Sequence, residues 1–362
     1  MHLTAWNIFR YELPLTAPLP MMGRELTIRS GLLLQVQDGG GRVGIGEVAP
    51  FPGLHKESLA AAREQLIEAT RTLLHHRFPD APEPLWWTLK GLPEYDRWFP
   101  TVRYGLEVAL VNLLAVRRSL SPAGLLFPRH REEIPVNALL VDNGEWEAHL
   151  QALLAEGYTT IKLKVGRKSP AEEGERVRAI SRRLPPGVRL RLDANRAWTP
   201  EEAVEFGQAV RGCPVEYIEE PLEDAAGIPQ FYQATGLPCA LDESLPDHNP
   251  EGFVPPSGVT ALVLKPSVIG GVAATLTWAA LARKHHLKVV ISSPVESGVG
   301  LAMAAQLAAG LHEEGVAAGL DTWRYLQEDL IRPRFSVSRG VVQISSLLPT
   351  PDLNHTVLTG ER

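Results

Sequence analysis

Five charged residues recur along the middle of this chain, and each lies at the end of a short apolar segment. They are Lys164, Asp193, Glu219, Asp242 and Lys265, separated by intervals of 23 to 29 residues. One strand, one helix and two short loops need about that many residues, because a crossover alone takes at least about 10–12. A parallel βα barrel keeps its catalytic groups at the C-terminal ends of its strands. The spacing therefore predicts such a barrel, with these five side chains on one rim.

Strand and helix patterns alternate from Ile134 onward, as a barrel requires. Thr199 precedes Pro200 and an acidic first turn, which is typical of a helix N-terminus. The expected helices include Ala171–Arg183, Pro200–Val210, Gly271–His285 and Val299–Ala309. The expected strands are Val136–Leu140, Thr160–Val165, Arg189–Asp193, Glu216–Glu219, Cys239–Asp242, Ala261–Lys265, Lys288–Ser292 and a short one near Ala317.

The first 125 residues follow a different pattern, with strands first and helices afterwards. Residues 2–12 and 31–37 read as strands, and the second continues into 42–48 across an Asp-Gly-Gly-Gly turn. Helical patterns cover Ser58–His75 and Val102–Ala115. The Pro/Trp-rich passage between them reads as a loop with at most short helical turns. This order predicts a separate α+β domain.

Composition limits the class of protein. Of the 362 residues, 44% are hydrophobic and 22% charged, as in soluble globular proteins. A net charge of −6 without a basic run gives no reason to expect nucleic-acid binding. No apolar stretch approaches the length of a membrane span, and the start lacks a signal-peptide pattern. Together with only two cysteines, this predicts a cytoplasmic enzyme that acts on small molecules.

Alternation along a strand decides which neighbouring charges share a face. Residues two apart point the same way, so Lys162 accompanies Lys164, and Arg191 and Asn195 accompany Asp193. By the same rule, Glu220 and Glu243 should point away from the site.

The carboxylates of Asp193, Glu219 and Asp242 would then meet on adjacent strands. All-oxygen ligands favour Mg²⁺, with Mn²⁺ as a substitute. Such a cation can bind a substrate carboxylate and stabilise the enediolate that forms when its α-proton leaves. Lys164 and Lys265 would lie on opposite sides of the metal. A lysine there would have a lowered pKa and could act as a base.

Structural ion pairs are the competing interpretation, since lysines and carboxylates near strand ends often pair without catalytic purpose. Any one of the five residues alone would be weak evidence. The joint pattern is stronger, because every member ends a segment that should otherwise be apolar.

These residues resemble the enolase superfamily, specifically its muconate-lactonising subgroup. The subgroup carries K-x-K on the second barrel strand, metal carboxylates on the third to fifth strands and a lysine on the sixth. Here Lys162-Leu163-Lys164 matches K-x-K, and the other four residues stand in DAN, EEP, DES and LKPSVIGG. The resemblance implies a modified TIM barrel, (β/α)7β, at 130–325. It also implies an α+β capping domain at 1–125 and a segment at 326–362 that returns to it.

Three stretches resemble the o-succinylbenzoate synthase family within that subgroup. They are GIGEVAPFPGLHKESL, RLRLDANRAWTPEEA and ISSPVESGVG. The resemblance implies a lyase of menaquinone or phylloquinone synthesis, which dehydrates 2-succinyl-6-hydroxy-2,4-cyclohexadiene-1-carboxylate. Lys164 would be base and then acid, Lys265 an electrostatic stabiliser, and Lys162 a contact of the substrate carboxylate that holds the pKa of Lys164 down. An N-acylamino-acid racemase or dipeptide epimerase, with both lysines as bases, is the alternative.

Further residues are candidates for binding the substrate. Ser292 and Ser293 close the seventh expected strand, where a hydroxyl and nearby amides could receive the succinyl carboxylate; capping the next helix is the alternative. Arg24 and Met22 lie in a loop that could reach the site from the capping domain or form plain surface. Arg191 and Asn195 complete the expected set. The oligomeric state stays open.

Overall fold

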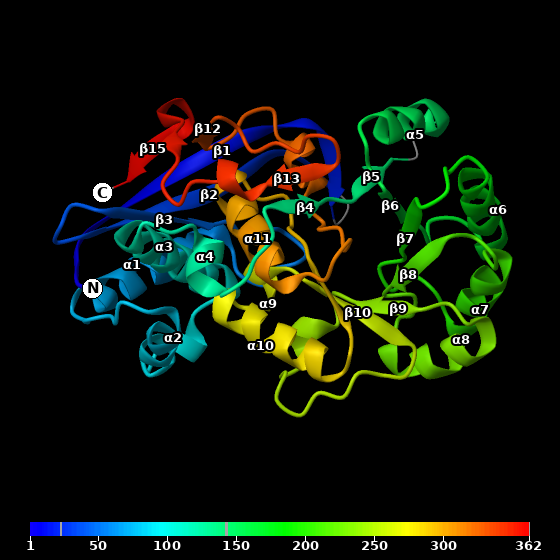
Figure 1. Cartoon of the computed structure of the whole chain (residues 1–362), viewed down its shortest axis with the longest axis horizontal. Coiled ribbons are helices and arrows are strands. Elements are labelled where there is room, and N and C mark those ends of the chain that lie inside the picture. Colours follow the sequence, from blue (N-terminus) through cyan, green and yellow to red (C-terminus); the bar gives the residue numbers. More distant parts are fainter. Residues whose placement is uncertain (22–23, 142–143, 362) are drawn as a thin grey trace.

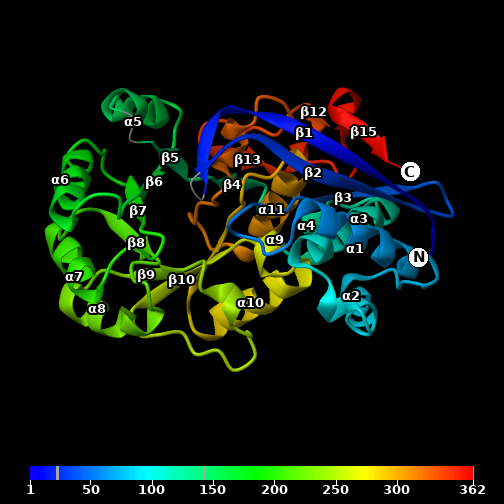
Figure 2. The ribbon, with the colours of Figure 1, turned by 180° about the vertical axis from the view of Figure 1, so that it is seen from behind.

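The chain folds into an N-terminal capping domain and a parallel barrel that lie side by side (Figures 1 and 2). The computed structural model describes residues 1–21, 24–141 and 144–361. No helix in these ranges is long and apolar enough to cross a membrane.

The capping domain is built on an antiparallel sheet with the order β15-β1-β2-β3. The Asp38 carboxylate accepts hydrogen bonds from the amides of Gly40 and Arg42 at 2.9 and 3.0 Å, which fixes the predicted turn between β2 and β3. The strands are β1 (Leu3–Met21), β2 (Arg24–Asp38), β3 (Val43–Val48) and β15 (Leu358–Glu361).

Helices α1 and α3 pack on this sheet, α3 mainly on β3, and α4 packs against α3. One expectation was wrong: the Pro/Trp-rich passage contains a nine-residue helix, α2, with Pro82 in its first turn. Proline is tolerated there because the first helical amides have no partner within the helix. The helices are α1 (Leu59–Leu74), α2 (Pro82–Lys90), α3 (Pro100–Arg118) and α4 (Pro122–Leu126).

The barrel contains seven parallel strands in the order β11-β10-β9-β8-β7-β6-β5. The predicted short strand near Ala317 closes it. Ala318 bridges Val136 before β5, and Gly319 bridges Ser292 after β11. The strands are β5 (Ala138–Leu140), β6 (Thr160–Lys164), β7 (Arg189–Asp193), β8 (Val215–Glu219), β9 (Cys239–Leu241), β10 (Val259–Leu264) and β11 (Lys288–Ile291).

Across the described ranges, a helix follows each barrel strand except β9, which is followed only by the short 3₁₀ turn Leu245–Asp247. The predicted start of α7 is confirmed: Thr199 and Glu202 form a reciprocal capping box around Pro200. The helices are α5 (Trp146–Ala155), α6 (Pro170–Ser181), α7 (Pro200–Ala209), α8 (Ile228–Thr235), α9 (Pro266–Ile269), α10 (Val272–Lys284) and α11 (Gly298–Leu311).

The C-terminal segment connects the two domains and returns to the capping sheet, where β15 pairs with β1. On the way it forms β13 (Val341–Gln343), which pairs with β4 (Glu133–Pro135), and β12 (Ile331–Arg332), which pairs with β14 (Asp352–Leu353). The boundaries after residues 125 and 325 stay a prediction.

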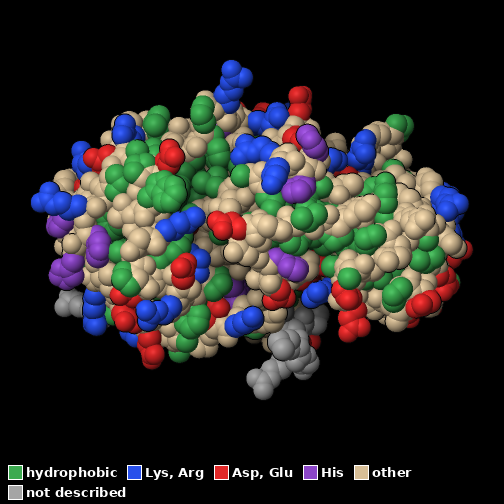
Figure 3. Space-filling view, turned by 90° about the horizontal axis from the view of Figure 1, so that it is seen from below, with side chains coloured by type: hydrophobic (Ala, Val, Ile, Leu, Met, Phe, Trp, Pro, Cys, Tyr) green, Lys and Arg blue, Asp and Glu red, His purple; other side chains and the backbone are tan. Residues whose placement is uncertain are grey.

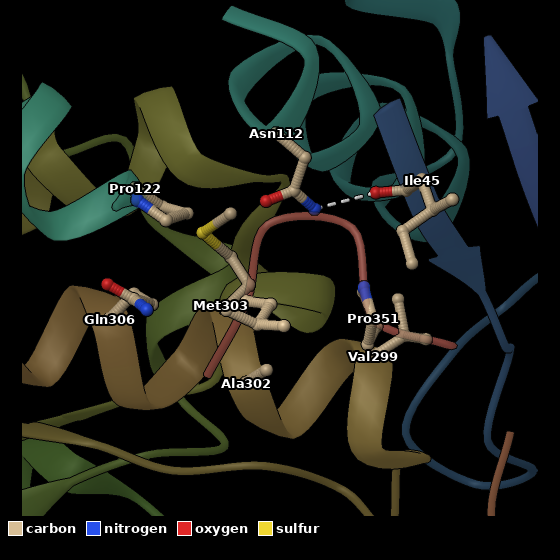
Figure 4. Close-up of a pocket in the computed structure, with 9 residues that line it drawn as sticks. Ile45, Asn112, Pro122, Val299, Ala302, Met303, Gln306 and Pro351 are labelled. Atoms are coloured by element: carbon tan, nitrogen blue, oxygen red, sulfur yellow. Dashed lines mark hydrogen bonds between the residues drawn. The ribbon is translucent and has the colours of Figure 1, made fainter. Parts of the chain in front are cut away.

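Helix α11 is one of the barrel helices that pack against the capping domain, together with α9 and α10. In Figure 4, Asn112 of α3 and Ile45 of β3 face α11 residues across a cavity of about 10 Å³, and Asn112 Nδ2 donates to the Ile45 carbonyl at 2.8 Å. Gln306 of α11 donates to Leu347 O at 3.2 Å and accepts from Ala123 N at 2.9 Å. Three parts of the chain therefore meet at α11. On the face in Figure 3, acidic and basic side chains are interspersed.

Candidate active site

The strand register brings the predicted charged residues together on one rim of the barrel. Lys164 pairs with Asp193 across β6 and β7, and Asp193 pairs with Glu219 across β7 and β8. Glu219 pairs in turn with Ala240 of β9, two residues before Asp242. Lys265 follows β10, the next strand. Lys164 and Lys265 thus stand at the two ends of a row of carboxylates.

Lysines and carboxylates form a continuous network along this rim. Lys162 Nζ lies 2.9 and 2.8 Å from the two oxygens of Glu219 and 3.0 Å from Asp193 Oδ2. Lys164 Nζ donates to Asp193 Oδ2 at 3.1 Å and to Asn195 Oδ1 at 2.5 Å. Lys265 Nζ contacts Asp242. Lys164 is the most exposed of these lysines, at 38% against 15% for Lys162 and 13% for Lys265.

The charges on this rim stabilise one another. Burial alone would raise the pKa of Asp193, but Lys162 and Lys164 hold it well below its usual range. Burial lowers the pKa of Lys162, yet Asp193 and Glu219 outweigh burial and keep that pKa well above its ordinary value. Asp193 and Lys162 are therefore both ionised at neutral pH.

Carboxylates crowd together at the other end of the row. Oxygen atoms of Glu219, Asp242 and Glu243 all lie within 4.8 Å of one another. The expectation that Glu243 points away was wrong, because β9 ends at Leu241 and the alternation rule stops applying there. Asn195 Nδ2 donates to Glu243 and links it to Lys164.

This acidic group fits a hard divalent cation. Burial raises the pKa of Asp242 well above its ordinary value, and Glu219 and Glu243 add to the rise against the opposing effect of Lys265. A cation among these oxygens would remove that repulsion, and carboxylate oxygens are the donors that Mg²⁺ and Mn²⁺ prefer. Asp193 is not part of the cluster of mutually close carboxylates found among the described residues.

Glu220 supports the site from behind. Its Oε1 accepts from the amides of Asp242 and Ser244 at 2.8 and 2.9 Å, and from Ser244 Oγ at 2.6 Å. The Glu220 backbone has a φ of +43°, a strained conformation for a residue with a side chain. The buried carboxylate thereby holds the segment that carries Asp242.

Arg191 shares the face of Asp193 but lies one layer deeper in the barrel. Its Nε donates to Glu216 at 2.8 Å, and its Nη1 donates to Asn137 Oδ1 at 3.1 Å and to Ala317 O at 2.7 Å. It therefore ties the closing segment of the barrel to β7 and β8. Its role as a substrate contact stays a prediction.

The two serines after β11 reach the same edge of the barrel. Leu264 pairs with Ile291, so Ser292 lies level with Lys265. Ser292 Oγ donates to Gly319 O at 3.3 Å, and Ser293 Oγ donates to Glu296 Oε2 at 2.7 Å. The alternative role as helix cap belongs to neither, because Ser297 caps α11.

The first-turn amides of α11 are already occupied. Gly298 N donates to Asp329 at 2.7 Å, Val299 N to Ser297 Oγ at 3.2 Å, and Gly300 N to Glu47 at 2.9 Å. At α10 the capping-domain residue Glu107 accepts from Ala273 N at 2.9 Å. The protein's own carboxylates therefore take the positions that a ligand anion would use at these helix ends.

Sequence reasoning missed a buried cluster between the two domains. Glu47 of β3 accepts from Ser297 N and Oγ at 3.1 and 2.6 Å and from the Tyr11 hydroxyl. Arg29 of β2 is 2% exposed and donates to Val295 O at 2.8 Å and to Pro50 O at 2.8 Å. A charged residue inside an apolar strand, such as the glutamate of VGIGEV, could have indicated this cluster.

Arg24 is the first residue of β2. Its side chain and all of Met22 lie outside the described residues, so their expected contact with substrate stays a prediction.

Comparison with known proteins agrees with this geometry. The family model "Enolase C-terminal domain-like" matches residues 145–349, and "MenC, N-terminal domain" matches residues 3–113. The o-succinylbenzoate synthase of Enterobacter sp. (strain 638) is 32% identical over 330 residues, which cover 90% of this chain and 93% of that protein. The chloroplastic protein PHYLLO of Arabidopsis thaliana is 34% identical over 350 residues, 86% of this chain but only 20% of that longer protein.

Solved structures show the same architecture. A dipeptide epimerase from Enterococcus faecalis V583, complexed with Mg and the dipeptide L-Leu-L-Tyr, superposes with a TM-score of 0.82. The match covers 99% of this chain and all of that one, at 19% identity. At that identity the likeness establishes the fold alone. With the sequence matches over both domains, the chain belongs to the o-succinylbenzoate synthase family of the enolase superfamily.

Proposed function

We propose that this protein is an o-succinylbenzoate synthase. It dehydrates 2-succinyl-6-hydroxy-2,4-cyclohexadiene-1-carboxylate to o-succinylbenzoate on the route to menaquinone or phylloquinone. The observation that carries the proposal is the placement of Lys164 and Lys265 at the two ends of a carboxylate row, in a chain that matches this family over both domains.

Lys164 is the acid–base residue in this proposal. It is the most exposed lysine of the rim, as a group that meets substrate must be. Its neutral amine takes the α-proton, and the C–H electrons form the new ring double bond. The resulting ammonium returns the proton to the departing hydroxyl, which leaves as water. One lysine suffices because both events occur on one face of the ring, and aromatisation favours the elimination.

Lys265 and Lys162 supply fixed positive charge. Lys265 would face the ring from the side opposite Lys164 and stabilise the negative charge that develops on the carboxylate. Lys162, held by Asp193 and Glu219, would contact the same carboxylate. Arg191, Asn195, Ser292, Ser293 and Arg24 are proposed to position the substrate.

Asp193, Glu219 and Asp242 are the proposed ligands of Mg²⁺, for which Mn²⁺ could substitute. When bound, the cation supplies positive charge next to the substrate carboxylate. Glu243 lies close enough to Glu219 and Asp242 to assist them.

The compartment is proposed to be the cytoplasm, where thiols stay reduced. Cys213 and Cys239 are both free, as such a compartment would leave them.

The activity is tested with purified protein, Mg²⁺ and the cyclohexadiene substrate, by following o-succinylbenzoate formation. Turnover that depends on the metal is expected, and no turnover would refute the function. Incubating N-succinyl amino acids of both configurations in deuterated solvent separates the alternative. Exchange into both, without dehydration, would identify a racemase instead.

A further inference from the structure

The loop between β11 and α11 places a buried carboxylate next to a serine of the proposed site. Glu296 is 2% exposed, and its Oε2 accepts from Ser293 Oγ at 2.7 Å. Glu47 of the capping domain is also 2% exposed and lies beside it. A Cβ built on Gly300 would lie 2.8 Å from Glu296 Cβ and 2.9 Å from Glu47 Oε2, so both acids flank that glycine.

The two neighbouring acids have very different surroundings. Glu47 accepts hydrogen bonds from the Tyr11 hydroxyl, from Ser297 N and Oγ, and from Gly300 N. Glu296 has fewer donors around it in the described part of the chain: it accepts from Ser293 Oγ, and the Ser267 hydroxyl lies near it. Donors stabilise the charged form, and two close carboxylates resist ionising together. The proton of the pair therefore resides on Glu296.

Other groups around Glu296 act in both directions. Burial and the Glu47 carboxylate raise the pKa of Glu296 to about 7, against the lowering by the Ser293 and Ser267 hydroxyls and by Arg29. The hydroxyls of Tyr11 and Tyr104 also face it from the capping domain. The buried Ser267 hydroxyl lies close to Glu296, so it can also accept a hydrogen bond from a protonated Glu296.

The state of Glu296 decides what Ser293 can offer a ligand. A serine hydroxyl has one proton. While Glu296 is ionised, Ser293 donates that proton to it and presents only lone pairs, which repel a carboxylate. Once Glu296 is protonated, its own O–H becomes the donor, and the Ser293 proton is free to turn outward. Ser292 cannot replace it while its hydroxyl is directed at Gly319 O.

We infer that Glu296 is a positioning residue whose neutral carboxylic acid makes the Ser293 hydroxyl a donor to the succinyl carboxylate of the ligand. The inference rests on the proposed function, which supplies that carboxylate. Binding above neutral pH then takes one proton from solvent onto Glu296. No covalent bond of the ligand changes in this step.

Calorimetric titration of the Mg²⁺-loaded protein with o-succinylbenzoate between pH 6 and 9 tests the inference. The Kd should be constant at the acid end and rise by up to about tenfold per pH unit above about 7. Buffers of different ionisation enthalpy should show uptake approaching one proton near pH 8. A Kd independent of pH, or no uptake, would overturn the inference.

Three variants test whether the pH dependence of Kd comes from Glu296 and Ser293. Glu296→Gln should bind with a Kd that stays flat above pH 7, since the amide donates at every pH. Ser293→Ala should bind weakly throughout, with no rise of Kd. Glu107→Gln is the matched control, a buried carboxylate between the same domains at α10, and should keep the wild-type profile.

The outcomes separate the two proposals. A Glu296→Gln protein with the wild-type profile contradicts the inference, and if this variant does not fold, the proton uptake of the wild type still decides. Failure of the wild type to bind o-succinylbenzoate at any pH overturns the proposed function, and the inference with it.

Discussion

The acids of the barrel rim and the acid Glu47 between the domains are both buried, but they are stabilised by different means. On the barrel rim, Asp193, Glu219 and Asp242 face the ammonium groups of three lysines. Between the domains, Glu47 is held by hydroxyl and amide donors. Charged ammonium groups stabilise the rim carboxylates, whereas neutral hydroxyl and amide groups stabilise Glu47.

The difference separates a site for chemistry from a site for docking. A lysine has a flexible aliphatic side chain, so its amino group can leave a carboxylate, take up a proton or move to a ligand. Amides at a helix N-terminus are fixed in direction, so they hold Glu47 and the capping domain in one position. The rim side chains can therefore change their partners and protons during a reaction, whereas the interface keeps one arrangement of the two domains.

The largest expected effect comes from the rim. Lys164→Ala should lower kcat by about 10⁴-fold, because one residue performs both proton transfers. Steady-state kinetics with substrate measure the loss, and circular dichroism should show an unchanged fold. Full activity in this variant would contradict the assigned mechanism.

The interface should respond in stability instead. Glu47→Ala leaves several buried donors without a partner, and the free energy of unfolding should fall by about 3–5 kcal/mol. Urea unfolding measures it. Arg10→Ala, which breaks an exposed ion pair with Glu12, is the control and should change stability by less than about 1 kcal/mol. Equal effects of the two variants would mean that the cluster does not hold the domains.

Glu296 gives the interface a pH dependence. Its pKa is raised in the folded protein to about 7 from an ordinary value of 4.5, so the native state holds the proton more tightly. The contribution of this proton to the free energy of unfolding is complete below about pH 4.5. It falls by about 3 kcal/mol as the pH rises through about 7. Glu296→Gln should lack this loss.

Urea unfolding of wild type and Glu296→Gln at pH 4.5 and 8 isolates the contribution of this one group. A wild type that loses no more stability than the variant over this interval would show that Glu296 is not protonated by its surroundings.

The smallest effect should be that of Glu243→Gln, which tests how far the acidic end of the rim extends. We expect the Mg²⁺ concentration for half-maximal activity to rise about tenfold, the effect of a residue that supports the ligands. A metal titration of activity measures it. An unchanged Mg²⁺ concentration for half-maximal activity would mean that Glu243 does not support the metal ligands.

The alternation of side chains along a strand predicted which residues lie on the rim, but it failed beyond the strand ends. Alternation along β6, β7 and β8 correctly grouped Lys162 with Lys164 and selected Glu219, because those residues lie inside regular strands. It misplaced Glu243, which lies beyond the end of β9. Arg191 shows a different limit: alternation gives the face of a residue but not its depth in the barrel.

The interface could not be predicted in this way. Glu47 and Ser297 are 250 residues apart, and Arg29 and Val295 are separated by 266. Neither strand periodicity nor a helix-capping signal reaches across such distances. An acid in an apolar strand signals that a partner is needed, but only the fold identifies it.

The pairing of β15 with β1 has a consequence for how the molecule is made. A ribosome synthesises β1 before the whole barrel and β15 after it. Until β15 emerges, the outer edge of β1 presents unpaired backbone groups that can pair with another chain. Newly made protein is thus exposed to misassembly along β1 until β15 pairs with it.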